Sequence, residues 1–344
     1  MARKATNNLL QNAKKSKKDE FYTQLCDIER ELQYYPYCFS GKVVYCNCDD
    51  PTVSNFFRFF KENFHKLGLR KLIASFYREQ PNDLFQMQTD DRPYYCEYDG
   101  KDDTMKTEQL HGDGDFRSKE CVELLLRSDV VVTNPPFSLF REFVSQIVRY
   151  KKQFLIIGNV NAITYKEIFG LIQSNKAWLG VNLGRGISGF IVPSHYQQYG
   201  TETRVNEKGQ TIIATNGCLW LTNLDVRQRH EDITLTKRYY GNEKDYPPYD
   251  NCNGINVNKT QDIPCDYEGL IGVPITFLHK YNPEQFEIVK FRKGDDGKDL
   301  RINGKCPYFR ILIRNKRVFV NNGTPASNRH ERSINTIANT SASH

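Results

Sequence analysis

The chain has 344 residues, of which 39% are hydrophobic and 26% charged, and its net charge at pH 7 is +7. This length and composition indicate a globular protein with a sizeable core, arranged as one large or two smaller domains. No apolar run is long enough to span a membrane, and the N-terminus lacks the apolar core of a signal peptide. We therefore expect a cytoplasmic protein without a membrane partner, and the positive charge weakly favours a polyanionic one.

The ten cysteines are scattered, without a Cys-x-x-Cys pair or a Cys/His cluster. Cys46 and Cys48 share one face of a predicted strand end, which is too little for a zinc site. Reduced and mostly buried thiols are expected in a cytoplasmic protein of this kind. No metal is therefore predicted.

The N-terminal segment, residues 1–18, carries six Lys or Arg and no acid. It is predicted to be a flexible basic arm, which is either simply disordered or also contacts phosphates. Phe21, Tyr22 and Thr23 follow it, and a helix is expected over Leu25–Tyr34.

A first core strand is predicted over Lys42–Cys46, followed by a turn over Asn47–Pro51. Asp50 or Ser54 is expected to cap the helix that begins near Pro51 and continues over Phe56–Leu67. A second strand is predicted over residues 71–76, and the polar stretch 79–109 is predicted to be an irregular excursion. Residues 110–116 then end in the acidic glycine turn Gly-Asp-Gly-Asp-Phe, before a helix over 118–127.

The most informative stretch is Asp129–Phe137, with the sequence Asp-Val-Val-Val-Thr-Asn-Pro-Pro-Phe. Its β-branched residues predict a buried strand that stops at Asn134, because a residue before proline avoids the helical region and proline lacks an N–H. Apolar residues at helical spacing follow over 139–148. A loop between a strand and a helix lies at the carboxyl end of the strand, where open α/β sheets bind ligands.

This loop suits methylation of an exocyclic amino group. The amine on a base ring is a poor nucleophile, because its lone pair is delocalised into the ring. The Asn134 side-chain carbonyl and the Pro135 main-chain carbonyl could each accept one amine hydrogen, and the prolines Pro135 and Pro136 would hold both acceptors fixed. Phe137 offers a face on which a base can stack. The alternative is an ordinary Pro-Pro turn after a strand.

Further strands are predicted over 152–158, 179–183 and 190–192, with a helix over 165–174. The turn Gly184-Arg185-Gly186 either closes an ordinary hairpin or approaches DNA. A second hairpin is expected between Thr211–Ala214 and Cys218–Thr222, around Asn216-Gly217.

The composition changes after Asn223. Short strands are plausible over 273–277, 286–290 and 309–313, between long loops. Residues 290–317 hold ten Lys or Arg and three acids, which indicates either a solvated surface or phosphate contacts from residues such as Lys290, Arg292 and Lys293. The end of the chain, 318–344, is predicted to be a disordered tail.

The Asn-Pro-Pro-Phe motif resembles that of amino-methyltransferases which use S-adenosylmethionine. The surrounding run through Phe140 resembles the EcoRI-type DNA adenine-N6 methyltransferases, as do three further segments, residues 45–51, 112–118 and 184–193. The resemblance covers the chain from Ala2 to about Arg317 and weakens over 78–110. It implies an α/β fold: a Rossmann-like S-adenosylmethionine-dependent methyltransferase domain of seven strands over 19–223. A smaller mixed C-terminal DNA-recognition domain would cover 224–317.

The resemblance also implies cofactor-binding residues. Phe21, Tyr22 and Thr23 match the motif that caps the methionine end of the cofactor. The strand and turn at Cys46, Asn47 and Asp49 match the cofactor loop, although the usual Gly-x-Gly is missing; Asp49 and Asp50 could also be plain helix caps. Asp115 would accept a hydrogen bond from the cofactor's adenine amine, and Phe116 would pack on its ring. Glu79 is the nearest acid for the ribose hydroxyls.

The implied reaction is methyl transfer to N6 of an adenine flipped out of double-stranded DNA. The resemblance further implies the site GAATTC, methylated at the inner adenine of each strand by a monomer, as the protective half of a type II restriction-modification system. Two alternatives remain. One is the same chemistry on cytosine N4, an RNA adenine or a protein glutamine. The other is a non-catalytic DNA-binding protein on this fold.

Overall fold

A computed structural model describes residues 22–78, 92–102, 104–182, 187–192, 203–214, 217–292, 299–306 and 309–318. The basic arm 1–18, Phe21, Glu79, the Gly184-Arg185-Gly186 turn, Lys293 and the tail beyond Val318 lie outside these residues. The chain divides between Val226 and Arg227 into two compact units, here called the N-terminal and C-terminal units.

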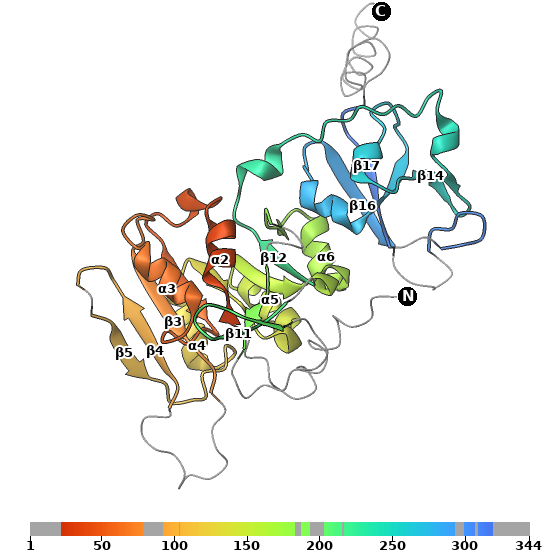
Figure 1. Ribbon diagram of the computed structural model, residues 1–344. Helices are drawn as coiled ribbons and strands as arrows, with labels where there is room; N and C mark the ends of the chain where they lie inside the picture. Colours follow the sequence, from red (N-terminus) through yellow and green to blue (C-terminus); the bar gives the residue numbers. More distant parts are fainter. Residues whose placement is uncertain are drawn as a thin grey trace, which may run out of the picture. The chain divides into compact units, whose positions relative to one another are not determined.

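The N-terminal unit is built on an eight-stranded sheet (Figure 1). Its four central strands, β3, β2, β6 and β7, are parallel, while the strands at both edges are antiparallel. The order across the sheet is β5 (Lys106–Gln109), β4 (Tyr94–Tyr98), β3 (Lys71–Ser75), β2 (Val43–Asn47), β6 (Val130–Thr133), β7 (Gln153–Asn159), β12 (Cys218–Thr222) and β8 (Trp178–Leu179). The predicted Rossmann-like α/β class is confirmed, with eight strands in place of seven.

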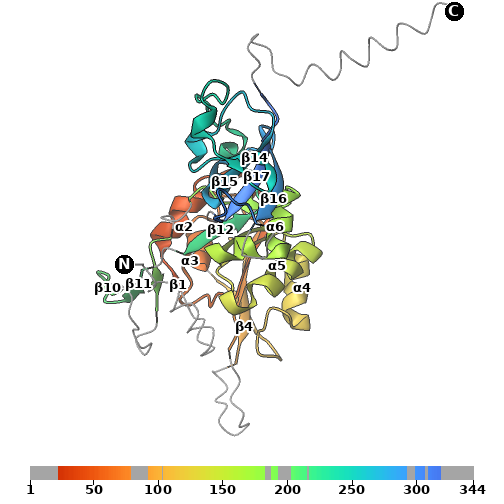
Figure 2. The same ribbon diagram turned by 90° about the vertical axis from the view of Figure 1, so that its right-hand side faces the viewer.

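Helices cover both faces of this sheet (Figure 2). On one side lie α2 (Leu25–Leu32) and α3 (Asn55–Glu62); on the other lie α4 (Lys119–Arg127), α5 (Phe140–Arg149) and α6 (Lys166–Gln173). Short 3-10 turns lie at η1 (Pro36–Cys38), η3 (Phe137–Leu139) and η4 (Val160–Thr164). Since successive strand residues face opposite sides, a strand covered by helices on both faces is apolar throughout. Residues 43–46 and 130–132 are accordingly all buried apolar side chains.

The core on the α2 and α3 side is rich in aromatic residues. Phe56 and Phe60 of α3 are fully buried beneath the sheet, together with Trp220 of β12. Ser54 caps α3 by accepting hydrogen bonds from the amides of Phe56 and Phe57. The helix ends at Glu62, five residues before the predicted end, and turns lead from there to Gly68.

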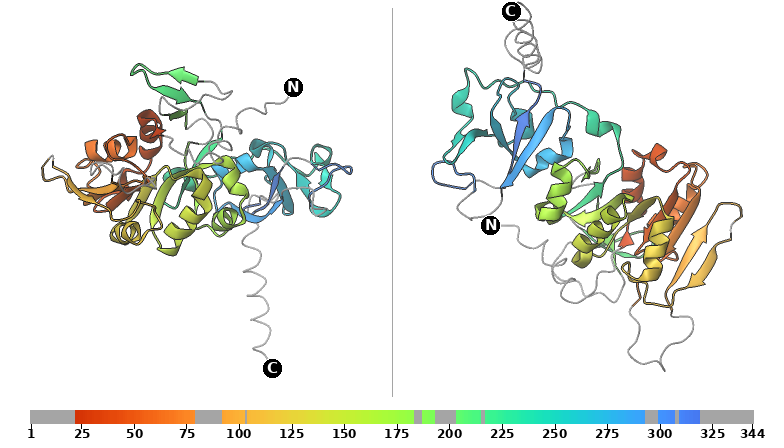
Figure 3. Two further views of the ribbon diagram at one scale, coloured as in Figure 1. Left: turned by 90° about the horizontal axis from the view of Figure 1, so that it is seen from below. Right: turned by 180° about the vertical axis from the view of Figure 1, so that it is seen from behind.

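A second, four-stranded sheet lies beside the first in the N-terminal unit. Its strand order is β1 (Tyr22–Thr23), β9 (Phe190–Ile191), β11 (Thr211–Ile213) and β10 (Thr203–Val205). The β10–β11 hairpin projects away from the eight-stranded sheet (Figures 2 and 3). This arrangement corrects two predictions. The segments 179–183 and 190–192 do not form a hairpin, because β8 pairs with β12 while β9 pairs with β1 and β11. Nor do β11 and β12 pair, since they belong to different sheets.

Two buried carboxylates of α2 explain the first correction. Glu31 accepts hydrogen bonds from the amides of Val181 and Asn182 at 2.7 and 2.9 Å, and Asp27 accepts one from the amide of Ser188 at 2.8 Å. Both side chains are fully buried. The chain is therefore anchored to one helix on either side of residues 183–186.

The stretch 79–109, predicted to be irregular, contains β4 and β5. These strands form a hairpin that extends the sheet at its edge, with β5 exposed along its whole length. Polar residues on such an exposed edge do not alternate with apolar ones, so the periodicity that reveals a half-buried strand is missing.

The C-terminal unit contains a five-stranded sheet in the order β13 (Pro248–Tyr249), β14 (Cys252–Asn256), β15 (Leu270–Pro274), β17 (Arg310–Asn315) and β16 (Phe286–Arg292). Only β14 and β15 are parallel. Its short helical turns are η5 (Arg227–His230), η6 (Glu243–Asp245), η7 (Thr260–Asp262) and η8 (Ile275–Lys280). The strand predicted over 273–277 begins three residues earlier, and its second half belongs to η8.

Candidate functional site

The Asn-Pro-Pro-Phe loop lies at the carboxyl end of β6, in the middle of the parallel part of the sheet. Asn134, Pro135 and Pro136 connect the strand to η3, which begins at Phe137, and the amide of Leu139 donates to the carbonyl of Pro136 at 3.1 Å. Pro135 is buried. The predicted order of strand, proline loop and helix is confirmed.

The aromatic residue of this loop faces the small sheet. The ring of Phe137 contacts the buried ring of Phe190 edge-on, with the centroids 6.0 Å apart. Phe190 lies on β9, whose partner strand β1 carries Tyr22 and Thr23. The segments around residues 22, 137 and 190 therefore lie together, although they are far apart in the sequence.

The end of β2 lies beside the end of β6, because the two strands pair in parallel register. Thr133, the last residue of β6, has its hydroxyl within hydrogen-bonding distance of the Asn47 carbonyl and of an Asp49 carboxyl oxygen. Cys48 takes a left-handed conformation with φ 66°, so the turn after β2 is tight without a glycine. The amide of Asp49 donates to the Ser75 carbonyl of β3 at 3.0 Å. The turn after β2 is thus fixed to the ends of both neighbouring strands.

Asp49 is the hub of this arrangement. Its side chain is buried and accepts a hydrogen bond from Ser54, the α3 cap, at 2.8 Å. Burial raises the pKa of Asp49 to about 7, and the hydrogen bonds with Thr133 and Ser54 counter only part of this shift. When protonated, Asp49 can donate to Thr133 while Thr133 donates to the Asn47 carbonyl, because each hydroxyl has one hydrogen to give. Asp49, predicted to contact the cofactor, therefore joins the turn after β2 to the end of β6.

Polar atoms next to this hub lack partners among the described residues. The side-chain oxygen and nitrogen of Asn47 and the hydroxyl of Thr23 are buried and make no hydrogen bond within that part of the chain. The Thr23 carbonyl, by contrast, accepts a hydrogen bond from Asn55 at 2.8 Å. Unsatisfied buried polar groups are costly, and a ligand with polar groups would satisfy them. Asn47 and Thr23 therefore fit the polar cofactor that the sequence predicted for them.

The Gly-Asp-Gly-Asp turn packs against the end of β3. Gly114 has φ +77°, and a Cβ there would lie 2.0 Å from the Phe76 carbonyl oxygen, so the position requires glycine. The amide of Arg78 donates to the Asp113 carbonyl at 2.9 Å. The turn is thereby brought to the same edge of the sheet as the ends of β2 and β6.

Asp115 and Phe116 are fixed within this turn. Asp115 pairs with Arg117 at 2.6 Å; burial alone would raise the pKa of Asp115, but Arg117 lowers it below its usual value. The side chain of Asp115 retains 20% exposure. Phe116 is buried and contacts Phe143 edge-on, with the centroids 5.1 Å apart. Asp115 is therefore an ionised acceptor, while Phe116 packs chiefly in the core.

Among the other predicted cofactor residues, Cys46 is fully buried in the core beneath α2 and α3, which leaves only its main chain for a ligand. Thr133 was missed by the sequence reasoning. Its signal was available, since a hydroxyl residue ends an otherwise apolar strand directly before Asn134.

Four cations of the basic run 290–317 make internal contacts, namely Arg310, Arg314, Lys316 and Arg317. Arg310 is buried and donates to Asn256 at 2.9 Å. Arg314 pairs with Glu287 at 2.8 Å, and Arg317 pairs with Asp232 at 2.6 Å. Lys290 of β16 is exposed. These contacts reduce the number of basic side chains in the run that could bind phosphates, because several of them already contact acids or amide oxygens.

Three further properties concern disulfides, metal ions and membranes. The ten cysteines are all free thiols. Among the residues that the structure describes, no group of three or more His, Cys, Asp or Glu side chains is placed to hold a metal ion. Within the same residues, none of the helices has the length and apolar character needed to cross a bilayer.

Comparison with known proteins identifies the family. The family model described as adenine-specific methyltransferase EcoRI matches residues 9–316. The chain is 64% identical to the type II methyltransferase M.EcoRI of Escherichia coli, over 92% of this chain and 99% of that protein. It is 38% identical to M.MgeORF184P of Mycoplasma genitalium, over 89% of this chain and 98% of the relative.

A third relative, M.MpnI of Mycoplasma pneumoniae, is 37% identical over 88% of this chain and 97% of its own length. No solved structure matches the chain significantly. The family match covers the Asn-Pro-Pro-Phe loop, the Asp49 hub and the Gly-Asp-Gly-Asp turn alike. The chain therefore belongs to the EcoRI family of adenine-specific methyltransferases.

Proposed function

We propose that the chain transfers the methyl group of S-adenosylmethionine to N6 of an adenine that is flipped out of duplex DNA. The observation that carries this proposal is the junction of β2 and β6. There the Asn134 loop lies beside a turn whose buried Asn47 amide lacks partners among the described residues. One strand end thus presents acceptors for an amine, and its neighbour presents polar groups for a cofactor.

The chain's own residues would prepare the amine. The Asn134 side-chain oxygen and the Pro135 main-chain oxygen accept the two N6 hydrogens, which turns the nitrogen lone pair toward the methyl group. Phe137, held against Phe190, supports the flipped base. When bound, S-adenosylmethionine supplies the electrophilic methyl group. As the N–C bond forms, the S–C electron pair stays on sulfur and the amine releases a proton.

On the cofactor side, Thr23 and Asn47 would bind the methionine end, and Asp115 would accept a hydrogen bond from the adenine amine. The ion pair with Arg117 keeps Asp115 ionised, which suits an acceptor. Arg117 is half exposed, so it can shift as the cofactor binds.

The DNA sequence that is methylated can be proposed as well. M.EcoRI, by its name, is a type II methyltransferase, and the high identity extends over almost all of both chains. We propose the site GAATTC, methylated at the inner adenine of each strand by a monomer. The methylation would protect host DNA in the cytoplasm from a cognate endonuclease.

The test is to methylate plasmid DNA with the purified chain and challenge it with a panel of endonucleases. Protection against cleavage at GAATTC, with no protection at the isomeric site GATATC, is the expected result. Digestion to nucleosides should yield N6-methyladenine. N4-methylcytosine, or methyl transfer only to RNA or to protein, would replace the proposal with one of the alternatives. A matched Asn134→Ala protein controls for contaminating methylases.

A further inference from the structure

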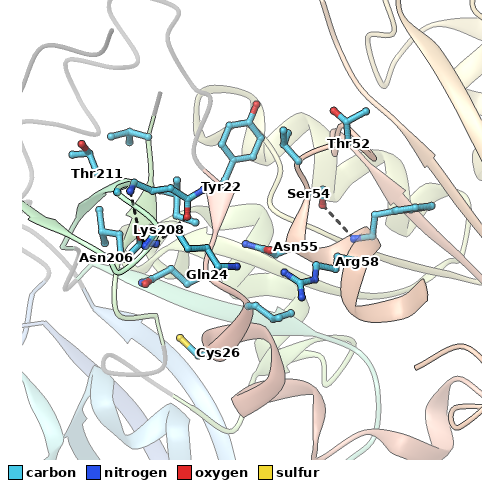
Figure 4. A pocket seen from close by; sticks show the side chains of 18 of the residues that line it. Tyr22, Gln24, Cys26, Thr52, Ser54, Asn55, Arg58, Asn206, Lys208 and Thr211 are labelled. Atoms are coloured by element: carbon cyan, nitrogen blue, oxygen red, sulfur yellow. Dashed lines mark hydrogen bonds between the residues drawn. The ribbon is translucent and has the colours of Figure 1, made fainter. Parts of the chain in front are cut away.

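A groove of about 1420 Å³ lies between α3 and the four-stranded sheet of the N-terminal unit (Figure 4). It is lined chiefly by residues from three places: the strands β1 and β9 with the start of α2, the segment from Pro51 to Lys61, and the β10–β11 hairpin; Met105 also contributes. Neither Asn134 and Phe137 nor Asn47 and Asp49 line it, whereas Tyr22 and Ser54, the partner of Asp49, do. The groove therefore borders the junction of β2 and β6 without including its central residues.

The four-stranded sheet connects the groove with the catalytic loop. One row across this sheet consists of paired residues that all line the groove, namely Tyr22, Ile191, Ile212 and Arg204. The adjacent row contains Phe190, which contacts Phe137. The groove and the residue that supports the catalytic loop therefore belong to the same thin sheet.

The lining is strongly cationic. Arg58 and Lys61 of α3 line one part of it, and Arg204 and Lys208 of the hairpin line another. Arg58 also pairs with Glu62 of the same helix at 2.7 Å. Among the described residues that line the groove, Glu207 is the only one with a carboxylate. Figure 4 shows Arg58 and Lys208 on different sides of the groove. Cations that face one another across a channel suit an anionic chain running between them.

The hairpin tip that carries Lys208 is held in a defined shape. The Asn206 side-chain oxygen accepts hydrogen bonds from the amides of Lys208 and Gln210 at 3.0 and 2.9 Å. The Asn206 side-chain nitrogen donates to the Gln210 side chain at 2.9 Å. Gly209 completes the turn with φ +73°. A fixed tip loses little conformational entropy when Lys208 binds a ligand.

We infer that this groove binds the sugar–phosphate backbone of the DNA strand next to the flipped base, with Arg58, Arg204 and Lys208 contacting phosphates. The inference rests on the proposed function, since it assigns a surface to the DNA of that reaction. Phosphate contacts fix the register of a protein on the duplex without reading its sequence. Placed on the sheet that supports Phe137, they would hold the duplex while one base is extruded.

The test uses the full chain with Arg204→Gln and Lys208→Gln combined. Each phosphate contact removed should reduce the slope of log K against log salt by about 0.9, so the double variant should lose roughly two units of slope. Its affinity should fall by roughly tenfold or more at low salt. Binding to GAATTC duplexes and to random duplexes should weaken in parallel, and KM for DNA should change more than kcat.

The matched control neutralises two exposed cations outside the groove, Lys66→Gln with Lys176→Gln. It removes the same formal charge, and its salt slope should stay within half a unit of the unaltered chain. An equal loss in this control would mean that net charge, and not the groove, governs binding.

Three results would overturn the inference. An unchanged salt slope in the Arg204→Gln, Lys208→Gln variant would show that these side chains do not contact phosphates. A loss confined to the GAATTC duplex would mean that these side chains read bases. Weakened S-adenosylmethionine binding, with unchanged DNA binding, would assign the groove to the cofactor. If the unaltered chain methylates no DNA at all, the proposed function itself fails, so the two failures are distinguishable.

Discussion

The ends of β2 and β6 lie side by side in the sheet, yet their loops are fixed in different ways. The loop after β6 is fixed covalently, by two prolines next to Asn134. The turn after β2 is fixed by side chains that come from distant parts of the chain, such as Thr133, 84 residues away from Asp49. Neighbouring loops of one site can therefore be rigid for different reasons, of which only the prolines are easily recognised in the sequence.

The two loops should also divide the work. In the proposed reaction, the loop after β6 would present acceptors to the amine, and the end of β2 would present polar groups to the cofactor. Substitutions in one loop should then leave the other function intact, except at Asp49, which connects both. Four predictions test this division, in order of expected effect.

Asn134→Ala should reduce single-turnover methylation by about 10²- to 10³-fold, because a preorganised acceptor in the transition state is lost. This corresponds to about 2.7–4 kcal/mol of barrier. Calorimetry should show S-adenosylmethionine binding close to that of the unaltered chain. Ser138→Ala, an exposed substitution in the same loop, is the matched control. Near-normal turnover by Asn134→Ala would end the assignment of this residue to the chemistry.

Asp49→Asn should change how stability depends on pH. The folded pKa of Asp49, about 7, lies above its ordinary value of 3.8. The folded state therefore retains the proton that the unfolded state releases, and this stabilisation is fully present below about pH 3.8 and lost as the pH rises through 7. The free energy of unfolding should fall by about 1.4 kcal/mol per pH unit in between, relative to Asp49→Asn. Denaturant titrations at several pH values measure this change in the free energy of unfolding. A difference between the two proteins that does not vary with pH would contradict the prediction.

Asp115→Ala should weaken S-adenosylmethionine binding by roughly tenfold to a hundredfold, as expected for a hydrogen bond to a charged group. The rate at saturating cofactor should change less. Because Asp115 also pairs with Arg117, the control is Arg117→Gln, which removes the ion pair and keeps the carboxylate. Equal losses in both variants would indicate a structural ion pair, and not a cofactor contact.

Asn47→Ala should have the smallest effect, a loss of up to about tenfold in cofactor affinity, as for one neutral hydrogen bond. Removing an amide without partners among the described residues should leave the stability of the cofactor-free chain unchanged or higher. Thermal unfolding with and without S-adenosylmethionine separates the two effects. A marked loss of stability without cofactor would show that Asn47 serves the fold.

The sequence predicted the central architecture well. The apolar runs around residues 44, 72, 131 and 155 are strands buried on both faces, and such runs are conspicuous. Strand pairing was harder: β9, β11 and β12 were predicted as strands, but the hairpins proposed for them were wrong. The partners of short strands depend on hydrogen bonds to residues far away in the sequence, such as Asp27 and Glu31. No local sequence pattern indicates these hydrogen bonds.

In the candidate site, too, features with a local sequence signal were predicted and features that depend on distant residues were not. Asn134 and its prolines were predicted because their constraint is local. The hub at Asp49 was not, because its pKa and its partners depend on burial between three strand ends. The density of basic residues along the sequence was also a poor guide to where the structure could bind an anion. In the dense run at 290–317, Arg314 and Arg317 are paired with acids, whereas the cationic groove collects residues as far apart in sequence as Arg58 and Lys208.

The two anchors on α2 have a practical consequence for protein engineering. Glu31 holds residues 181 and 182, and Asp27 holds residue 188, so both ends of the intervening segment are attached to one rigid helix. A peptide tag inserted between residues 183 and 186 would be flanked by residues 182 and 188, which are both hydrogen-bonded to α2.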